Sequence, residues 1–306
     1  MIPKTFEEKF SQILGKEYSE FSRLFNFKLK KSIRINTIKT EKKEILRRLG
    51  ERNWKLEQIP WFEDGFWVSG SDVLENLAKT LEYFLGYYYI QEAASMIPPL
   101  VLNPSENDKV LDMCAAPGSK TTQMAQMMNN EGLIVAIDDN LKRLKALRNN
   151  IQRMGIKNTI VILMDARKFW RKGYKFNKIL LDAPCSGSGT FVTTESIFKT
   201  WSPWLVRRMS NLQKELLISA WKCLEEDGIL VYSTCSLDPE ENEEVIDFAI
   251  RKLNAKVEKV KLKGVKVRKG LTSYNDRNYD EEVKKCIRIW PQDNLTEGFF
   301  ICKLKK

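Results

Sequence analysis

The sequence predicts an α/β protein whose larger part is built on a doubly wound parallel sheet. Strand-like and helix-like patterns alternate regularly from residue 109 to residue 253. This alternation is typical of β-α-β units, in which a crossover helix returns the chain to a parallel strand. A second observation is the direct succession of a strand, a tight turn and a helix over 109–129. The third is that several of the predicted strands end in an acidic residue.

Each element of this larger part follows from a short pattern. Apolar runs predict strands at 109–113, 133–137, 159–163, 178–182 and 228–233. Apolar residues at helical spacing predict helices at 119–129, 141–154, 204–224 and 239–253. Alternation over 256–269 favours an exposed strand, and 297–304 is expected to close the chain as an antiparallel edge strand.

The first ninety residues predict a smaller α/β unit. Two short helices are expected within 4–25, and further elements are predicted as strands at 32–37, 54–59 and 87–90 and helices at 41–49 and 74–85. A further helix, at 93–100, is predicted just after this unit. We expect the prolines at 98, 99 and 104 to end the last of these helices. Residues 27–52 hold ten basic and three acidic residues, which suits phosphate contacts and an ordinary solvated surface equally well.

Composition and charge limit the class of protein. With 306 residues and 43% hydrophobic residues, the chain is long enough for one large and one small core. The net charge of +11 favours a polyanionic partner, although a lysine-rich surface is an alternative. No apolar run reaches the roughly 20 residues that span a bilayer, and the first residues lack a signal-peptide core. We therefore expect a cytoplasmic protein with no membrane partner.

The chain has six cysteines and no histidine. Without histidine or a C-x-x-C pair, zinc sites and histidine-based catalysis are excluded, and no metal is expected. In a reducing compartment the thiols stay free, so each is either packed or reactive. Four of them are interpreted as packing or surface residues, namely Cys114, Cys223, Cys286 and Cys302.

The stretch 111–122, L-D-M-C-A-A-P-G-S-K-T-T, predicts a cofactor site. Ligands of open α/β sheets bind where a strand ends and the next helix begins, because that helix offers unpaired N–H groups. The glycine spacing fits neither the G-x-G-x-x-G motif of dinucleotide folds nor a phosphate loop.

Four acidic residues and two thiols follow predicted strand ends. The acidic residues are Asp112, Asp138, Asp165 and Asp182. All such ends open onto one crevice, where Asp138 is placed for a ribose diol and Asp165 for an adenine amino group. Cys185 and Cys235 follow strands that are neighbours in such a sheet, so they are expected to face each other. Nearby basic side chains would lower the pKa of such accessible thiols.

Three long motifs in this order resemble the signature blocks of the Sun-family (Nol/Nop/Sun) RNA cytosine-5 methyltransferases. They are D-M-C-A-A-P-G-S-K-T, D-A-P-C-S-G-S-G-T and Y-S-T-C-S-L-D-P-E-E-N-E. Shorter blocks are R-I-N-T at 34–37, Y-Y-I-Q-E-A-A-S-M at 88–96, Q-K-E-L-L at 213–217 and T-E-G-F-F at 296–300. The resemblance covers about residues 30–304, and an archaeal-type tRNA member is expected.

The resemblance implies a Rossmann-like sheet that binds S-adenosylmethionine, with a small RRM-like α/β domain in front. We expect the RNA-binding domain over 1–90 and the methyltransferase domain over 91–306. The cofactor side is assigned to Cys114, Ala115, Ala116, Pro117, Gly118, Ser119, Lys120, Asp138, Arg143, Asp165 and Asp182. The partner implied is RNA, with tRNA favoured over ribosomal RNA, and the protein is expected to be a monomer.

The family assigns Cys235 as the nucleophile and Cys185 as the residue that helps release the product. A thiolate must add to carbon 6 of cytosine before carbon 5 can accept a methyl group, and carbon 5 must then lose its proton. The residues alone do not decide which thiol attacks, because DNA cytosine-5 methyltransferases use a Pro-Cys thiol that resembles 184–185. Asp182 could hold the base through a protonated carboxyl favoured by burial. Lys120 could serve either the cofactor or the base.

Two further interpretations concern charge and competing functions. The acidic run over 238–247 is interpreted as complementing a helix dipole. The alternatives to an RNA cytosine-5 methyltransferase are an enzyme that methylates a small molecule or amine, and a catalytically silent RNA-binding scaffold.

Overall fold

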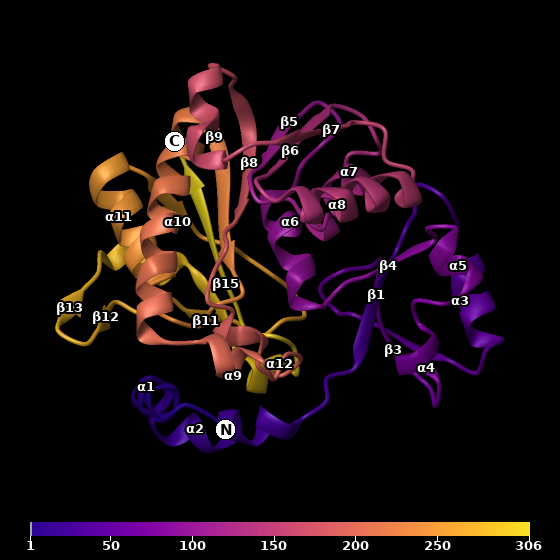
Figure 1. The fold of residues 1–306 in the computed structure, drawn as a ribbon, viewed down its shortest axis with the longest axis horizontal. Helices are drawn as coiled ribbons and strands as arrows, with labels where there is room; N and C mark the ends of the chain where they lie inside the picture. The colour runs from indigo at the N-terminus through magenta and orange to yellow at the C-terminus, as the bar shows by residue number, and fades with distance from the viewer. Residues whose placement is uncertain (1) are drawn as a thin grey trace.

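A computed structural model of the chain describes residues 2–306. Two main sheets organise it, a four-stranded sheet near the N-terminus and a nine-stranded sheet that follows it (Figure 1). A two-stranded hairpin, β12 (Ser273–Tyr274) with β13 (Arg277–Asn278), is separate from both.

The larger sheet has the strand order β11-β14-β15-β9-β8-β5-β6-β7, with β10 paired to β15. Its first strands are β5 (Lys109–Asp112), β6 (Leu133–Asp138), β7 (Thr159–Leu163), β8 (Phe176–Asp182) and β9 (Leu224–Thr234). The later ones are β10 (Lys256–Glu258), β11 (Arg268–Lys269), β14 (Ile287–Ile289) and β15 (Phe299–Lys305). Strands β7, β6, β5, β8 and β9 run parallel, which confirms the predicted doubly wound sheet. The chain order reverses between β5 and β8, where such sheets bind ligands.

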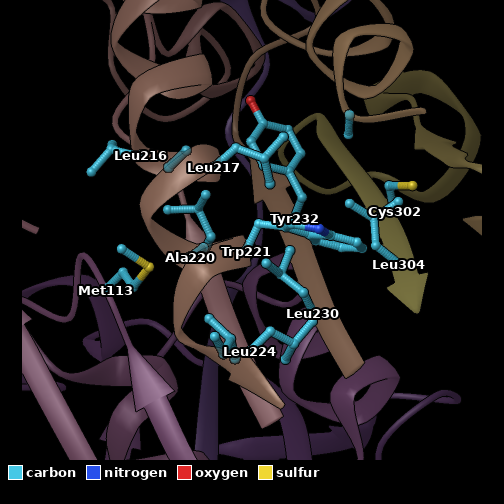
Figure 2. Packing of buried hydrophobic residues seen from close by; sticks show 14 of the residues in the cluster. Met113, Leu216, Leu217, Ala220, Trp221, Leu224, Leu230, Tyr232, Cys302 and Leu304 are labelled. Carbon is cyan, nitrogen blue, oxygen red and sulfur yellow. The ribbon is translucent and has the colours of Figure 1, made fainter. Parts of the chain in front are cut away.

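Helices cover both faces of this sheet (Figure 1). They are α6 (Ile97–Leu102), α7 (Ser119–Met127), α8 (Leu141–Met154), α10 (Pro203–Cys223) and α11 (Glu243–Leu253). Apolar residues of α10 and α11 share one core with the strands, while α6, α7 and α8 contribute to the core on the other face. Figure 2 shows Leu217, Ala220 and Trp221 of α10 over Leu230 and Tyr232 of β9.

The smaller sheet has the order β2-β3-β1-β4, with every neighbouring pair antiparallel. Its strands and helices are β1 (Lys31–Ile35), α3 (Lys42–Gly50), β2 (Lys55–Gln58), β3 (Gly65–Ser69), α4 (Val73–Asn76), α5 (Leu81–Phe84) and β4 (Tyr88–Ile90). The chain order is thus β-α-β-β-α-β, a split β-α-β arrangement. Ile45 and Leu49 of α3 pack on Ile33 and Ile35, which builds a separate core on one face.

The opposite face of this sheet lies against the larger unit through Arg34. This fully buried side chain donates to Thr122 Oγ1 of α7 at 2.7 Å and to Gln91 Oε1 at 2.9 Å. It also donates to the Gln126 amide oxygen. The basic residue of the R-I-N-T block therefore joins the two sheets and is not available for a phosphate.

The first two helices, α1 (Lys4–Leu14) and α2 (Tyr18–Ser22), pack on the larger unit. Phe6 and Phe10 share an aromatic cluster with Phe191, Trp201 and Trp290. Figure 1 shows both helices beside the short helices α9 (Ile197–Thr200) and α12 (Pro291–Asn294) and away from α3. Within the described residues 2–90, the residues of the smaller core belong to β1 to β4, to their helices or to the turns between them. The predicted boundary at residue 90 stays a prediction.

Several predicted elements differ from the structure. β15 is an inner strand between β9 and β14, so the predicted edge position is wrong. The predicted strand 256–269 is limited to β10 and β11, because the chain turns at Gly264 with φ 75° against Pro60. Predicted helix 74–85 is divided where the Thr80 side chain accepts from Tyr83 N and begins a new helix. Prolines 98 and 99 stand in the first turn of α6, where a missing N–H costs nothing, and so do not end it.

Candidate active site

A cavity of about 810 Å³ opens at the carboxyl ends of the parallel strands. Residues that follow β5, β6, β7, β8 and β9 line it, together with one side of α10. Its size falls within the range of small-molecule sites. The predicted residues that line it are Cys114, Ala116, Asp138, Arg143, Asp165, Asp182, Cys185 and Cys235. The expected crevice is therefore present with three of the four acidic strand ends. Asp112 is the exception, because it is buried and accepts from Thr121 Oγ1 at 2.7 Å.

Asp138 ties the first turn to the end of β6. Its carboxylate accepts from Ala116 N at 3.2 Å and from Asn140 N at 3.0 Å. Arg143 lies 3.5 Å from the same carboxylate and also donates to Ala116 O at 2.5 Å. These bonds hold a buried acidic side chain at the cavity edge with lone pairs remaining for a hydroxyl pair.

The other predicted cofactor residues belong to the turn before α7 and to the first positions of that helix, outside the cavity lining. Ala115, Pro117, Gly118, Ser119 and Lys120 do not line the cavity. Gly118 has φ 105°, and a Cβ there would lie 2.7 Å from Leu147 Cδ1. Only glycine fits where α7 starts this close to α8.

Asp165 binds Arg167, which stands two residues later in the helical turn that Asp165 caps. It accepts from Arg167 N at 3.0 Å and forms an ion pair with the Arg167 guanidinium at 2.8 Å. The hydrogen bond from Arg167 holds the pKa of Asp165 below its usual value. Asp165 still lines the cavity, so the predicted adenine contact stays a prediction.

Lys120 and Asp182 form an ion pair between α7 and β8. Lys120 Nζ donates to Asp182 Oδ2 at 2.7 Å, and Ser233 Oγ donates to Asp182 Oδ1 at 2.7 Å. Lys120 also donates to Ser95 Oγ at 3.1 Å. Asp182 thus has an ammonium partner and a hydroxyl partner, and its predicted contact with the base stays a prediction. Lys120 does not line the cavity itself, and its ammonium group holds the Asp182 carboxylate, which does.

The two thiols meet across the crevice, as predicted. Cys185 Sγ and Cys235 Sγ lie 3.2 Å apart, because β8 and β9 are neighbours with Asp182 opposite Ser233. Two causes raise the pKa of Cys185 well above its ordinary value: the larger is the hydrogen bond with Cys235, and the second is burial. The expected lowering of that pKa by nearby bases is therefore wrong. Cys185 keeps its proton and is suited to donate it toward the sulfur of Cys235.

A buried carboxylate, which the sequence reading missed, holds both cysteine loops. Glu241 accepts from Ser186 N at 2.8 Å and from Ser236 Oγ at 2.9 Å, and the Ser186 hydroxyl also donates to it. Gln213 of α10 donates to Glu241 Oε2 at 3.0 Å and to Pro184 O at 2.9 Å. Each serine directly follows a cysteine, so one carboxylate fixes both thiols.

The acidic run is only partly explained by the helix dipole. Glu243 and Glu244 do lie in the first turn of α11. Asp238 instead pairs with Lys9 of α1 at 2.5 Å, and Glu243 forms a buried ion pair with Arg288. The hydroxyls of Ser186 and Ser236, the amide of Gln213 and the indole N–H of Trp201 donate to Asp238 or Glu241. Hydrophobic spacing alone could not reveal these bonds; the signal was the position of a serine after both cysteines.

These residues fit a methyl donor that carries a nucleoside. The hydrogen-bonded turn before α7, the Asp138 carboxylate and Asp182 surround one cavity whose other wall carries the two thiols. Sheet order and site together define an α/β enzyme of the S-adenosylmethionine-dependent methyltransferase class.

Comparison with known proteins names the family. The chain matches the family described as 16S rRNA methyltransferase RsmB/F over residues 99–305, and the N-terminal domain of 16S rRNA methyltransferase RsmF over residues 2–93. The chain belongs to this RsmB/F family of methyltransferases, which confirms the Sun-family resemblance, the enzyme class and the cofactor class.

Two curated relatives illustrate its range. The tRNA (cytosine(49)-C(5))-methyltransferase of Pyrococcus abyssi is 46% identical over 306 residues, covering all of this chain and 96% of the relative. Ribosomal RNA small subunit methyltransferase F of Psychromonas ingrahamii is 38% identical over the whole chain. This chain spans only 63% of the length of that bacterial relative.

Solved structures agree on the fold. A methyltransferase homolog protein from Pyrococcus horikoshii has a TM-score of 0.86 and 35% identity, covering 99% of this chain and 95% of its own. NSun6 from Pyrococcus horikoshii, solved with SFG, has a TM-score of 0.85 and 27% identity, covering 99% and 98%. Separately, none of the helices within residues 2–306 has the length and apolar character needed to cross a membrane.

Proposed function

We propose that this protein transfers a methyl group from S-adenosylmethionine to carbon 5 of a cytidine in RNA, through a covalent adduct with Cys235. The single observation that carries the proposal is the 3.2 Å separation of Cys185 Sγ and Cys235 Sγ in the wall of the cofactor cavity. A methyltransferase for a small molecule or an amine has no use for two facing thiols.

In this mechanism S-adenosylmethionine supplies an electrophilic methyl group. The Cys235 thiolate bonds to carbon 6, which places electron density on carbon 5 so that carbon 5 can accept the methyl group. A base then removes the proton from carbon 5, the electron pair re-forms the 5,6 double bond, and the bond to Cys235 breaks. The thiolate leaves, and Cys185, which holds a proton 3.2 Å away, stabilises it.

In this proposal Asp182 binds the cytosine base, and Lys120 holds Asp182 in position. The carboxylate lies at the end of β8, beside the strand that leads to Cys235, and lines the same cavity. As an acceptor it can bind the exocyclic amine of cytosine, and the Lys120 ammonium fixes its orientation. Asp138 and the turn before α7 bind the nucleoside half of the methyl donor.

The RNA-binding part of the proposal rests on exposed lysine and arginine side chains outside the first sheet. Several basic residues of the N-terminal unit already form ion pairs, for example Arg47 with Glu44 and Lys42 with Asp64. On α8, Lys142, Lys145 and Arg148 form no ion pair with any of residues 2–306 and are available to phosphates. We propose the β1–β4 unit as a second contact, the RNA as a tRNA, the protein as a monomer and the location as cytoplasmic.

Two observations favour tRNA. The archaeal relative named for tRNA is 46% identical, against 38% for the Psychromonas relative named for ribosomal RNA, and it matches this chain almost end to end. The test is transfer of tritium from labelled S-adenosylmethionine to unmodified tRNA and to 16S ribosomal RNA, offered separately. We expect tRNA to be labelled, bisulfite sequencing to map one cytidine, and Cys235→Ala to be inactive. Preferential labelling of 16S RNA refutes the tRNA assignment, and RNA binding without methyl transfer favours the scaffold.

A further inference from the structure

A large aromatic side chain stands exposed at the mouth of the cavity. Trp204 lies in the first turn of α10, after Ser202 caps the helix by accepting from Leu205 N at 3.2 Å. Its exposed fraction is 69%, although it lines the same cavity as Cys185 and Cys235. The neighbouring Trp201 is buried in the aromatic cluster of α1, so core packing explains that tryptophan and not Trp204.

The charge beside this indole is positive. The Arg208 guanidinium lies 5.5 Å from the centre of the Trp204 ring, and it forms no ion pair with any of residues 2–306. Arg207 pairs with Glu244 at 2.8 Å, but Lys214 and Arg277 occupy the same carboxylate at 2.8 and 2.7 Å. Glu244 thus faces three cations, while Arg208 beside the indole has no acidic partner among residues 2–306. The surface is suited to an anion that also carries an aromatic ring.

An exposed indole beside an unpaired guanidinium matches the chemistry of single-stranded RNA. Bases stack on tryptophan, and arginine contacts the phosphate that connects them. A cytidine that reaches the thiols has to leave its stack, so its neighbour loses a stacking partner at the cavity mouth. Trp204 and Arg208, here called the Trp204 shelf, line the same cavity as the two thiols.

We propose that the Trp204 shelf binds the nucleotide next to the target cytidine, with its base stacked on Trp204 and its phosphate on Arg208. The inference rests on the proposed RNA methylation and names a substrate subsite of that reaction. The shelf replaces the stacking that the target base gives up, so it acts on RNA binding and base extrusion and leaves cofactor binding unchanged.

The test compares Trp204→Ala, Trp204→Phe and Arg208→Ala with the wild type on unfractionated tRNA. Trp204→Ala is expected to raise KM for RNA about tenfold, Trp204→Phe to restore it to within about threefold, and Arg208→Ala to reduce the salt dependence of binding. Tyr174→Ala is the matched control, because Tyr174 is a 62% exposed aromatic outside this cavity. The Kd for S-adenosylmethionine should stay unchanged in all four variants.

A second readout does not depend on turnover. A synthetic RNA that contains the mapped cytidine carries 2-aminopurine beside it, and its fluorescence should be quenched by the wild type and by Tyr174→Ala but not by Trp204→Ala. Equal quenching and equal KM in Trp204→Ala overturn the inference while methyl transfer by the wild type stands. A weaker Kd for S-adenosylmethionine in Trp204→Ala also overturns it, since Trp204 then covers the cofactor. Absence of methyl transfer in the wild type is a failure of the proposed function instead.

Discussion

Replacing Glu241 by alanine should separate the two cysteine loops. The carboxylate accepts from Ser186 N at 2.8 Å, Ser236 Oγ at 2.9 Å and Gln213 Nε2 at 3.0 Å. Two of these donors have other acceptors, because Ser236 also reaches Asp238 at 3.2 Å and Gln213 reaches Pro184 O at 2.9 Å. The buried N–H of Ser186 has no such alternative, and a buried donor without a partner costs about 1–3 kcal/mol.

With the volume lost on truncation, we expect Glu241→Ala to lower the free energy of unfolding by about 3 kcal/mol. Displacement of the thiols by a fraction of an ångström to 1 Å should lower kcat about 100-fold while the Kd for S-adenosylmethionine stays the same. Glu241→Gln keeps one carbonyl oxygen for Ser186 N, so its loss of stability should be about 1 kcal/mol.

Three assays test this reasoning. Urea unfolding measures stability, single-turnover methyl transfer measures chemistry, and mild oxidation with diamide measures how readily Cys185 and Cys235 form a disulfide. The last readout reports the distance between the thiols independently of RNA, and Glu241→Ala should slow it. Wild-type rates of oxidation and turnover in a folded Glu241→Ala protein would refute the role of Glu241 as a positioning residue.

Three further changes have expected outcomes from the same contacts. Gly189→Ala should nearly abolish turnover in a folded protein, because its Cβ would lie 2.5 Å from Gly298 O and 2.7 Å from Cys235 O; rates within twofold of wild type would contradict that packing. Asp138→Ala should raise the Kd for S-adenosylmethionine at least about tenfold by calorimetry, since it removes charge-assisted hydrogen bonds to a ribose. Burial raises the pKa of Asp112 to about 7, so the stability that its protonated form contributes is lost as pH rises from about 4 through 7. In urea unfolding, the free energy of unfolding of Asp112→Asn relative to the wild type should therefore be higher at pH 8 than at pH 5; an equal difference at both pH values would contradict this.

Local patterns were enough to predict the larger sheet and the position of its crevice. Each parallel strand is a short apolar run followed by polar residues, and such strands open onto one edge whatever their order. The neighbouring positions of Cys185 and Cys235 followed from strand order alone, and their sulfurs do lie 3.2 Å apart. The same logic placed Asp138 and Asp182 in the cavity lining.

Features that depend on partners distant in sequence were not predictable in this way. Arg34 is one of the ten basic residues of 27–52, for which a phosphate-binding and a solvated surface were equally expected, but it is fully buried between two sheets because Thr122 and Gln126 meet it there. β15 looked like an edge strand, but β14 pairs along its other side. Glu241 was interpreted as complementing a helix dipole, whereas it accepts hydrogen bonds from Ser186, 55 residues earlier, and from Ser236, 5 residues earlier.

The central claim is that Cys235 bonds to cytosine and Cys185 lets it go, and one gel measures this directly. Cys185→Ala protein, incubated with S-adenosylmethionine and unmodified tRNA, should carry the RNA as a covalent band under denaturing conditions. The double variant Cys185→Ala with Cys235→Ala should show no band. A band that persists in the double variant, or one that forms with Cys235→Ala alone, would reverse or remove the assigned roles of the two sulfurs.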